Sequence, residues 1–339
     1  KPNLLYGQNP DRAVTTHPVF FEGVIRVFQS FGLSLTFGDS PGYGNIASVS
    51  KKAGLLSVAE QYKIPLANFE QALVKELPLG TQKVQIPIAE GALLADGMVS
   101  LPKMKTHGLT RITGAIKNQL GCVPGFHKAE FHFRFPHIDA FATLLVNLNL
   151  LLKPRLYIMD GIVAMEGEGP GGGDPVPMGC ILLSADPVAL DATFCRLINL
   201  NPSFVPTLRL GEALGLGTAQ EAAIEFLGDS LEILKRPTFN VKRSPPLQEV
   251  TFQGLRPLRN FILPKPRIRR ELCQRCGVCV EACPVPEKAI QFTKGKKNPP
   301  QYTYSKCIRC FCCHEMCPYK AINIYTPWMG KLLLNLLGR

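Results

Sequence analysis

The sequence of 339 residues lacks several features that would place a protein in a membrane or outside the cell. The best candidate for a membrane span, residues 144–152, ends at Lys153, well short of the ~18 to 20 apolar residues that a bilayer requires. No signal peptide is recognisable, and the chain opens with Lys1 instead of Met, so we expect a piece of a longer protein. We predict a cytoplasmic location and no transmembrane segment.

The Gly-rich segments lack the two common nucleotide-binding patterns. Gly42 and Gly44 begin like a dinucleotide fingerprint, but the third Gly is absent three positions on. This disfavours NAD or FAD held in that way and leaves open a flavin held by other contacts. A second segment lacks the Gly-Lys-Ser/Thr ending of a phosphate-binding loop and carries Glu166, Glu168 and Asp174, whose charges repel phosphate.

The composition, 46% hydrophobic and 19% charged, excludes a disordered chain, a collagen and a coiled coil. Charge is distributed unevenly along the chain. Residues 1–234 carry 18 Lys and Arg against 21 Asp and Glu, whereas residues 235–339 carry 20 against 5. A basic third is one sign of nucleic-acid binding, but aromatic residues for base stacking are sparse there. We expect no nucleic-acid partner.

Cysteine is concentrated in the same basic third. Of the twelve cysteines, nine fall between Cys273 and Cys317. Cys122, Cys180 and Cys195 stand in apolar or Gly-rich surroundings and are expected to be small buried core residues. Secreted disulfide scaffolds are usually short chains without a large α/β partner domain, so metal binding is the better interpretation of the nine.

Eight of these cysteines form two runs of the pattern Cys-x2-Cys-x2-Cys-x3-Cys-Pro, offset by 34 residues. Two complete runs are similar to the two-cluster ferredoxins of bacteria, in which the fourth cysteine of each run binds the other cluster. The resemblance implies two [4Fe–4S] clusters, the first on Cys273, Cys276, Cys279 and Cys317 and the second on Cys307, Cys310, Cys313 and Cys283. Zinc is the alternative, although its sites rarely use this spacing twice. The ninth residue, Cys312, is expected to pack beside Cys313.

The first two thirds of the chain alternate helical and strand-like segments. Apolar residues recur at helical spacing over residues 18–31 and 138–152, and short apolar strands are predicted at residues 33–37, 156–159 and 180–183. This alternation predicts an α/β domain with a mostly parallel sheet flanked by helices, followed by a small α+β ferredoxin-like domain. In such sheets, functional side chains follow the carboxyl ends of strands.

Three polar loops are predicted at such places, over residues 38–44, 101–107 and 160–174. The second loop contributes Lys103, Lys105 and His107, and Lys117 follows in the next helix. On a solvated face these cations would have no particular role, whereas gathered in a cleft they would bind an anionic substrate. We favour the cleft because the surrounding sequence is apolar.

The same segments resemble the DUF362 family, a domain of unknown function often fused to a ferredoxin-type module. The resemblance covers residues 1 to about 215 and rests on residues 1–4, 13–18, 38–42, 103–107, 114–118, 160–162 and 184–191. It implies a related fold and a redox context, without a reaction. The polar residues that match are Lys1, Asn3, His17, Asp39, Lys103, Lys105, His107, Lys117, Asn118, Asp160 and Asp191.

We predict four parts: an α/β domain (1–234), a basic Pro-rich strap (235–270), a two-cluster domain (271–326) and an amphipathic tail (327–339). The tail is expected to cover the domain interface, with attachment to a membrane or a partner as the alternative.

The favoured function is an iron–sulfur oxidoreductase that passes single electrons from a soluble partner protein to an anionic small molecule. The candidate catalytic residues are His107, His17, Lys103, Lys105, Lys117 and Asp39, with either histidine as the proton donor. This hypothesis requires a cluster close to the cleft.

Two alternatives remain. An electron-transfer subunit without its own substrate would have no enclosed pocket. A non-redox enzyme with structural or sensing clusters would instead use Asp39, Asp160, Glu166 and Asp191.

Overall fold

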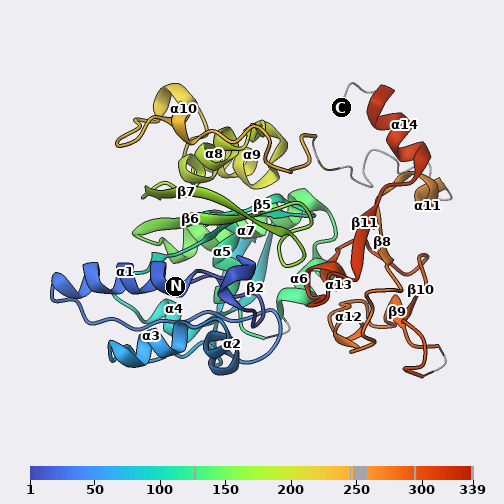
Figure 1. Ribbon diagram of the computed structural model, residues 1–339, viewed down its shortest axis with the longest axis horizontal. Helices are drawn as coiled ribbons and strands as arrows, with labels where there is room; N and C mark the ends of the chain where they lie inside the picture. The colour runs from blue at the N-terminus through green and yellow to red at the C-terminus, as the bar shows by residue number, and fades with distance from the viewer. Residues whose placement is uncertain (126, 245, 247–257, 294, 337–339) are drawn as a thin grey trace.

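The computed structural model of the protein describes residues 1–125, 127–244, 246, 258–293 and 295–336. A larger α/β body is followed by a small α+β module at one side of it (Figure 1). The helices of the body are α1 (Pro18–Ser30), α2 (Ile46–Lys52), α3 (Leu55–Gln61), α4 (Glu90–Leu93), α5 (Ala115–Asn118), α6 (His127–Arg134), α7 (Ile138–Leu152), α8 (Pro187–Leu197), α9 (Pro206–Ala213) and α10 (Leu231–Leu234). Its strands are β1 (Ala72–Leu79), β2 (Gln82–Ala89), β3 (Val99–Ser100), β4 (Lys103–His107), β5 (Arg111–Thr113), β6 (Leu156–Glu166) and β7 (Asp174–Ser184).

The body is built on a five-stranded sheet with β6 at its centre. Strands β3 and β4 pair with β6 in parallel, while β7 runs antiparallel to β6 and β5 antiparallel to β4. Outside these strands, isolated parallel β-bridges pair Pro2 with Leu101 and Phe37 with Leu66. The separate hairpin of β1 and β2 packs against α7. The predicted α/β class is confirmed.

Successive residues of β6 face two different apolar cores, as the alternation of a strand requires. Ile158 packs with α1, α2 and α3, whereas Tyr157 and Met159 pack with α7 and α8. Figure 1 shows α8, α9 and α10 on one side of the sheet and α1, α2 and α3 on the other. The central strand is therefore covered on both faces.

The predicted helices lie where the sequence indicates. Residues 138–152 form α7, which ends because Lys153 adopts a left-handed conformation (φ 43°). The helix after residue 186 is α8, in which Pro187 occupies the first turn and the Asp186 carboxylate accepts the amides of Val188 and Ala189. The helix expected over residues 18–31 is α1, one residue shorter.

Two of the predicted loops are largely strand. Residues 103–107 form β4, whose side chains are all buried, because its lysines find polar partners inside the body. Strand β6 continues through Glu166 and returns as β7, so only residues 167–173 remain of the loop expected over residues 160–174. The strand predicted at residues 33–37 is reduced to the bridge at Phe37.

The C-terminal module consists of two equivalent strand–helix–strand units. They are β8 (Lys265–Ile268), α12 (Val278–Glu281) and β9 (Ile290–Gln291), then β10 (Gln301–Tyr302), α13 (Cys312–Glu315) and β11 (Ile322–Tyr325). Because β8 pairs with β11 and β9 with β10, the units are related by an approximate twofold axis. The duplication seen in the sequence is thus a duplication of structure.

The strap and the tail frame this module. The predicted strap includes residues 245 and 247–257, which lie outside the described residues. Helix α11 (Arg259–Ile262) follows and packs against the tail helix α14 (Trp328–Leu336) so closely that a Cβ on Gly330 would lie 2.0 Å from the Ile262 carbonyl. Figure 1 places α14 beside α11, away from the sheet. Within the described ranges, no helix has the length and apolar character needed to cross a membrane.

Candidate functional site: an interdomain cavity beside two cysteine clusters

One set of four cysteines surrounds a small cavity in the C-terminal module. The cavity is lined by Cys273, Cys276, Cys279 and Cys317, together with the backbone of the loop between them. The first three come from the first cysteine run and the fourth from the second run. These are the residues that the ferredoxin resemblance assigns to the first cluster.

The second set gathers in the apolar core of the same module. Cys283, Cys307 and Cys313 belong to this core, and Tyr302 donates a hydrogen bond to Cys313 Sγ over 3.3 Å. Cys310 is partly exposed and lies beside Cys312.

The loops that carry the cysteines have matching backbone conformations. Arg275 and Gly277 have positive φ angles of 55° and 93°, and their equivalents Arg309 and Phe311 have 62° and 63°. Residues other than Gly rarely adopt this conformation, so both loops are held in a shape that local preference alone would not select. Such turns wrap the three closely spaced cysteines of each run around a common centre.

The cysteines are available to bind clusters. None of the twelve forms a disulfide, and four of them surround the cavity of the first set. A cavity of this kind suits a multinuclear group, and [4Fe–4S] clusters bound there would supply one-electron transfer.

A second cavity, of about 100 Å³, lies where the body meets the module. We call it the interdomain cavity. The body contributes Lys105, Lys117 and Lys128 to its wall, with His132, Asn3, Asn118 and Asp39. The module contributes Glu281 and Ala282 at the end of α12, and Cys312, Glu315 and Met316 from α13. Gly42 lies close to this contact, because a Cβ there would lie 2.9 Å from the side chain of Met316.

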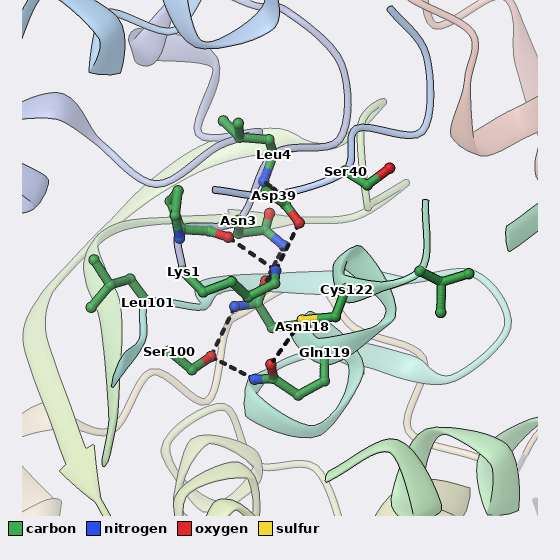
Figure 2. Close-up of polar contacts among 12 residues, drawn as sticks. Lys1, Asn3, Leu4, Asp39, Ser40, Ser100, Leu101, Asn118, Gln119 and Cys122 are labelled. Carbon is green, nitrogen blue, oxygen red and sulfur yellow. Dashed lines mark hydrogen bonds and ion pairs between the residues drawn. The ribbon is translucent and has the colours of Figure 1, made fainter. Parts of the chain in front are cut away.

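Three residues of the lining, Asn3, Asp39 and Asn118, belong to a polar network that also includes Lys1 and Ser100 (Figure 2). Lys1 Nζ lies 2.8 Å from Asp39 Oδ1 and donates to Asn118 Oδ1 over 3.2 Å. The other Asp39 oxygen accepts the Leu4 amide over 2.6 Å. Asn118 Nδ2 donates to Ser100 Oγ over 2.9 Å. Asp39 is therefore already neutralised by its protein partners.

The three lysines of the wall retain capacity for a ligand. Lys105 Nζ donates to Asn3 Oδ1 and Val14 O, and Lys128 Nζ donates to Ser40 Oγ and Val123 O. Each ammonium has three protons, so each keeps one for another acceptor. Among the residues that the structure describes, Lys117 Nζ has no hydrogen-bond or ion-pair partner.

Burial and neighbouring positive charges lower the pKa values of Lys105 and Lys128. Burial lowers the pKa of Lys128 to about 7. It also lowers the pKa of Lys105 well below its ordinary value, and the charges of Lys117 and Lys103 lower it further. An anion in the cavity would favour the protonated form of each, which makes the cavity an anion-binding environment.

His107 and Glu315 connect the body to the module. His107 Nδ1 accepts the amides of Leu109 and Thr110, so Nε2 carries the proton of the neutral ring and faces Glu315 Oε1 at 3.0 Å. Burial and the nearby Lys117 lower the pKa of His107 to about 4. Burial alone would raise the pKa of Glu315, but His107 and Lys117 hold it well below its usual range. At neutral pH the pair is a neutral imidazole and a carboxylate.

The remaining predicted residues lie outside the lining of this cavity. Lys103 Nζ pairs with Asp160 Oδ2 at 2.7 Å in the buried sheet, and the same oxygen accepts the His17 amide. The His17 ring instead accepts the Val19 amide at the start of α1. These three residues form a separate group behind the cavity.

The acidic residues do not form a common site. The Asp191 carboxylate accepts the backbone amides of Ala115 and Ile116 at the start of α5, which is a structural role. Burial raises the pKa of Asp191 to about 7. Glu166 accepts the Asn240 amide. With Asp39 and Asp160 each paired to a lysine, the four acids of the non-redox alternative have separate partners.

The cavity residues that escaped the sequence analysis include Lys128, His132 and Glu315. Lys128 and His132 lie four residues apart on α6, a spacing that puts them on one helix face and that a predicted helix would have revealed. The imidazole of His132 stacks on Phe141 with ring centroids 4.2 Å apart, and burial lowers its pKa to about 4. Glu315 gave no signal, because its role depends on how the module docks.

These features define an iron–sulfur protein in which a ferredoxin-type module closes a polar cavity on an α/β body. The pattern of the 4Fe–4S dicluster domain matches residues 265–318. The chain belongs to the family described as domain of unknown function (DUF362), whose pattern matches residues 1–196. The resemblance inferred from the sequence is thereby confirmed.

Among curated proteins, the chain is similar to Thylakoid-associated protein sll1697 of Synechocystis sp. (strain ATCC 27184 / PCC 6803 / Kazusa). The two are 34% identical over 223 residues, which cover 65% of this chain and 69% of that protein. No solved structure matches the chain.

Proposed function

We propose that the protein is an oxidoreductase that transfers electrons from two [4Fe–4S] clusters to an anionic small molecule bound in the interdomain cavity. A soluble redox protein would serve as the electron donor. When bound, the clusters supply electrons one at a time; the chain's own residues bind the substrate, exclude water and deliver protons.

The position of the cavity beside residues that neighbour both cysteine sets carries this proposal. Ala282 and Met316 both line it, and they directly precede Cys283 and Cys317, the two cysteines assigned to the opposite clusters. These lining residues are equivalent in the duplication, 34 positions apart. A ligand in the cavity would therefore lie close to both cysteine sets, as the redox hypothesis requires.

The charges of the cavity support an anionic substrate. Asp39 is paired with Lys1 and Glu281 is exposed, so the buried carboxylate of Glu315 is the main negative charge that Lys105, Lys117 and Lys128 face, and the lysines outnumber it. Ammonium groups in such a sheltered place bind carboxylate or phosphate oxygens more strongly than they would in water. The alternative of an electron-transfer subunit without a substrate offers no reason for this enclosed group of cations.

Protons can come from the same wall. A two-electron reduction of an organic bond also consumes two protons, and a donor is most effective when its pKa is near the working pH. Lys128 meets this condition because burial lowers its pKa to about 7. His107, which faces the cavity only through Glu315, is proposed to position that carboxylate, and Lys103 and His17 to support the strand that carries Lys105.

The test begins with anaerobic quantification of iron and sulfide, for which about eight irons per chain are expected. The protein is then reduced with dithionite, freed of excess reductant, and monitored by EPR while pools of metabolites are added. We expect the reduced signal to disappear with particular organic anions and to persist with neutral analogues.

Two variants connect this result to the cavity. Lys117→Met should slow the reoxidation without changing the iron content, because Lys117 lies in the body's wall of the cavity and is not assigned to a cluster. Lys51→Met removes an exposed lysine of α2 and serves as the matched control. A signal that no metabolite reoxidises would favour the carrier role, and zinc in place of iron would refute the proposal.

A further inference from the structure

A wide groove opens beside the interdomain cavity. Its volume is about 1010 Å³, and it shares Asp39, Ser40, Gly125, Ala129 and Glu281 with the wall of the cavity. These shared residues place the groove directly against the cavity. A molecule larger than the cavity would extend from the lysines across this shared lining into the groove.

The walls of the groove are apolar on both sides. The body contributes Ile46, Phe69 and Pro124, and the module contributes Pro284, Val285 and Pro286. Both the body and the module thus contribute apolar residues to the lining, which suits an uncharged, apolar body of a ligand better than a strongly hydrated one.

The charged side chains of the groove are mostly acidic, and the three lysines of the cavity are absent from its lining. Glu70, Glu130 and Glu281 belong to its lining. The groove has two basic residues. Lys288 Nζ donates to the backbone carbonyl oxygens of Glu281 and Cys283. His127 Nδ1 lies 3.2 Å from Glu130 Oε2. A second anionic group placed in the groove would meet these carboxylates and be repelled.

We infer that the ligand of this site is an amphipathic organic monoanion, with its anionic group on the lysines of the cavity and its apolar body in the groove. The inference deepens the proposed function and rests on it for electron transfer, but not for binding. Cys283, assigned to the second cluster, lines the groove, so the apolar body would pass beside that cysteine set.

The test measures binding to the oxidised, cluster-loaded protein by isothermal titration calorimetry. The probes are 2-naphthoate, acetate, 2-naphthol and naphthalene-2,6-dicarboxylate. Because only 2-naphthoate has both an anionic end and a neutral apolar body, we expect it to bind about tenfold more tightly than each of the other three. Equal affinity for acetate and 2-naphthoate, or preference for the dicarboxylate, would overturn the inference.

Variants separate the two halves of the site. Lys117→Met should weaken 2-naphthoate about tenfold and leave 2-naphthol unchanged, with Lys51→Met as the control. Val285→Asp should weaken 2-naphthoate and leave acetate unchanged. Since residue 285 is close to a cysteine ligand, Glu70→Lys provides a second probe on an exposed side chain: it should improve binding of the dicarboxylate relative to 2-naphthoate. Iron and sulfide are measured for every variant, and variants that bind all probes like the wild type would also contradict the inference.

Binding and electron transfer fail separately in this design. If 2-naphthoate binds as expected but no metabolite reoxidises the reduced protein, the ligand class stands and the proposed function fails. If metabolites reoxidise the protein but the dicarboxylate or acetate binds best, the proposed function stands and the ligand class is refuted.

Discussion

The protonation of Lys128 should control anion binding in the interdomain cavity near neutral pH. Its Nζ uses two protons on Ser40 Oγ and Val123 O and keeps the third for a ligand. Burial lowers its pKa to about 7; of the charged groups near it, Asp39 raises the pKa and Lys1 lowers it. Below this pH the ammonium is present, and above it the amine is neutral.

The size of the effect follows from this pKa. About nine tenths of Lys128 is protonated one pH unit below the pKa and about one tenth one unit above, so affinity should fall about tenfold from about pH 6 to about pH 8. His132 contributes nothing to this change because burial lowers its pKa to about 4. Lys105, whose pKa is also lowered, adds to the slope if it titrates in the same range.

Calorimetric titration of 2-naphthoate at constant ionic strength measures this dependence directly. In Lys128→Met the slope should shrink to the part that Lys105 contributes, whereas Lys51→Met should retain the full slope. An affinity independent of pH in the wild type, or an unchanged slope in Lys128→Met, would show that the buried lysine does not bind the anion as an ammonium.

Three further predictions concern the supporting structure. Lys103→Met leaves the fully buried carboxylate of Asp160 without its lysine and should reduce the free energy of unfolding by about 3–5 kcal/mol, measured by denaturant titration with iron content checked; Asp160→Asn added to it should restore part of the loss. Cys312→Ser should retain about eight irons, whereas Cys310→Ser should retain about four. Tyr302→Phe removes a hydrogen bond to Cys313 Sγ and should lower the reduction potential of one cluster, as redox titration followed by EPR would show.

Much of the fold was predictable because local signals and tertiary structure agree. The helix over residues 138–152 has apolar spacing throughout and a clear end, and the Asp186–Pro187 pair marks the start of α8. Strand β4 was missed because its lysines contradict the usual apolar pattern of a buried strand. Lys103 is tolerated there because Asp160, 57 residues away in the sequence, supplies a partner. A local sequence pattern does not indicate such a long-range contact.

The site was predictable only in part, for a similar reason. The lysine-rich segment and the cysteine runs are visible in the sequence, and the structure brings Lys105 and Lys117 to the cavity. Nothing in the sequence distinguishes Lys103 and His17 from the lysines that reach the cavity, but in the structure Lys103 and the His17 amide contact Asp160 instead of the cavity. The contribution of Glu315 exists only after the module docks on the body, and docking depends on contacts such as His314 with Glu168 and Lys320 with Asp174.

The duplication of the module supplies a matched pair that tests how the cavity sets its charge. Glu281 and Glu315 are equivalent in the two units, yet Glu281 is exposed while Glu315 is buried against His107 and near Lys117. Glu315→Gln removes a sheltered negative charge and should strengthen 2-naphthoate binding severalfold, whereas Glu281→Gln removes a solvated charge and should have a much smaller effect. Equal effects of the two variants would mean that the buried carboxylate does not reach the anion, and that the lysines alone determine the potential of the cavity.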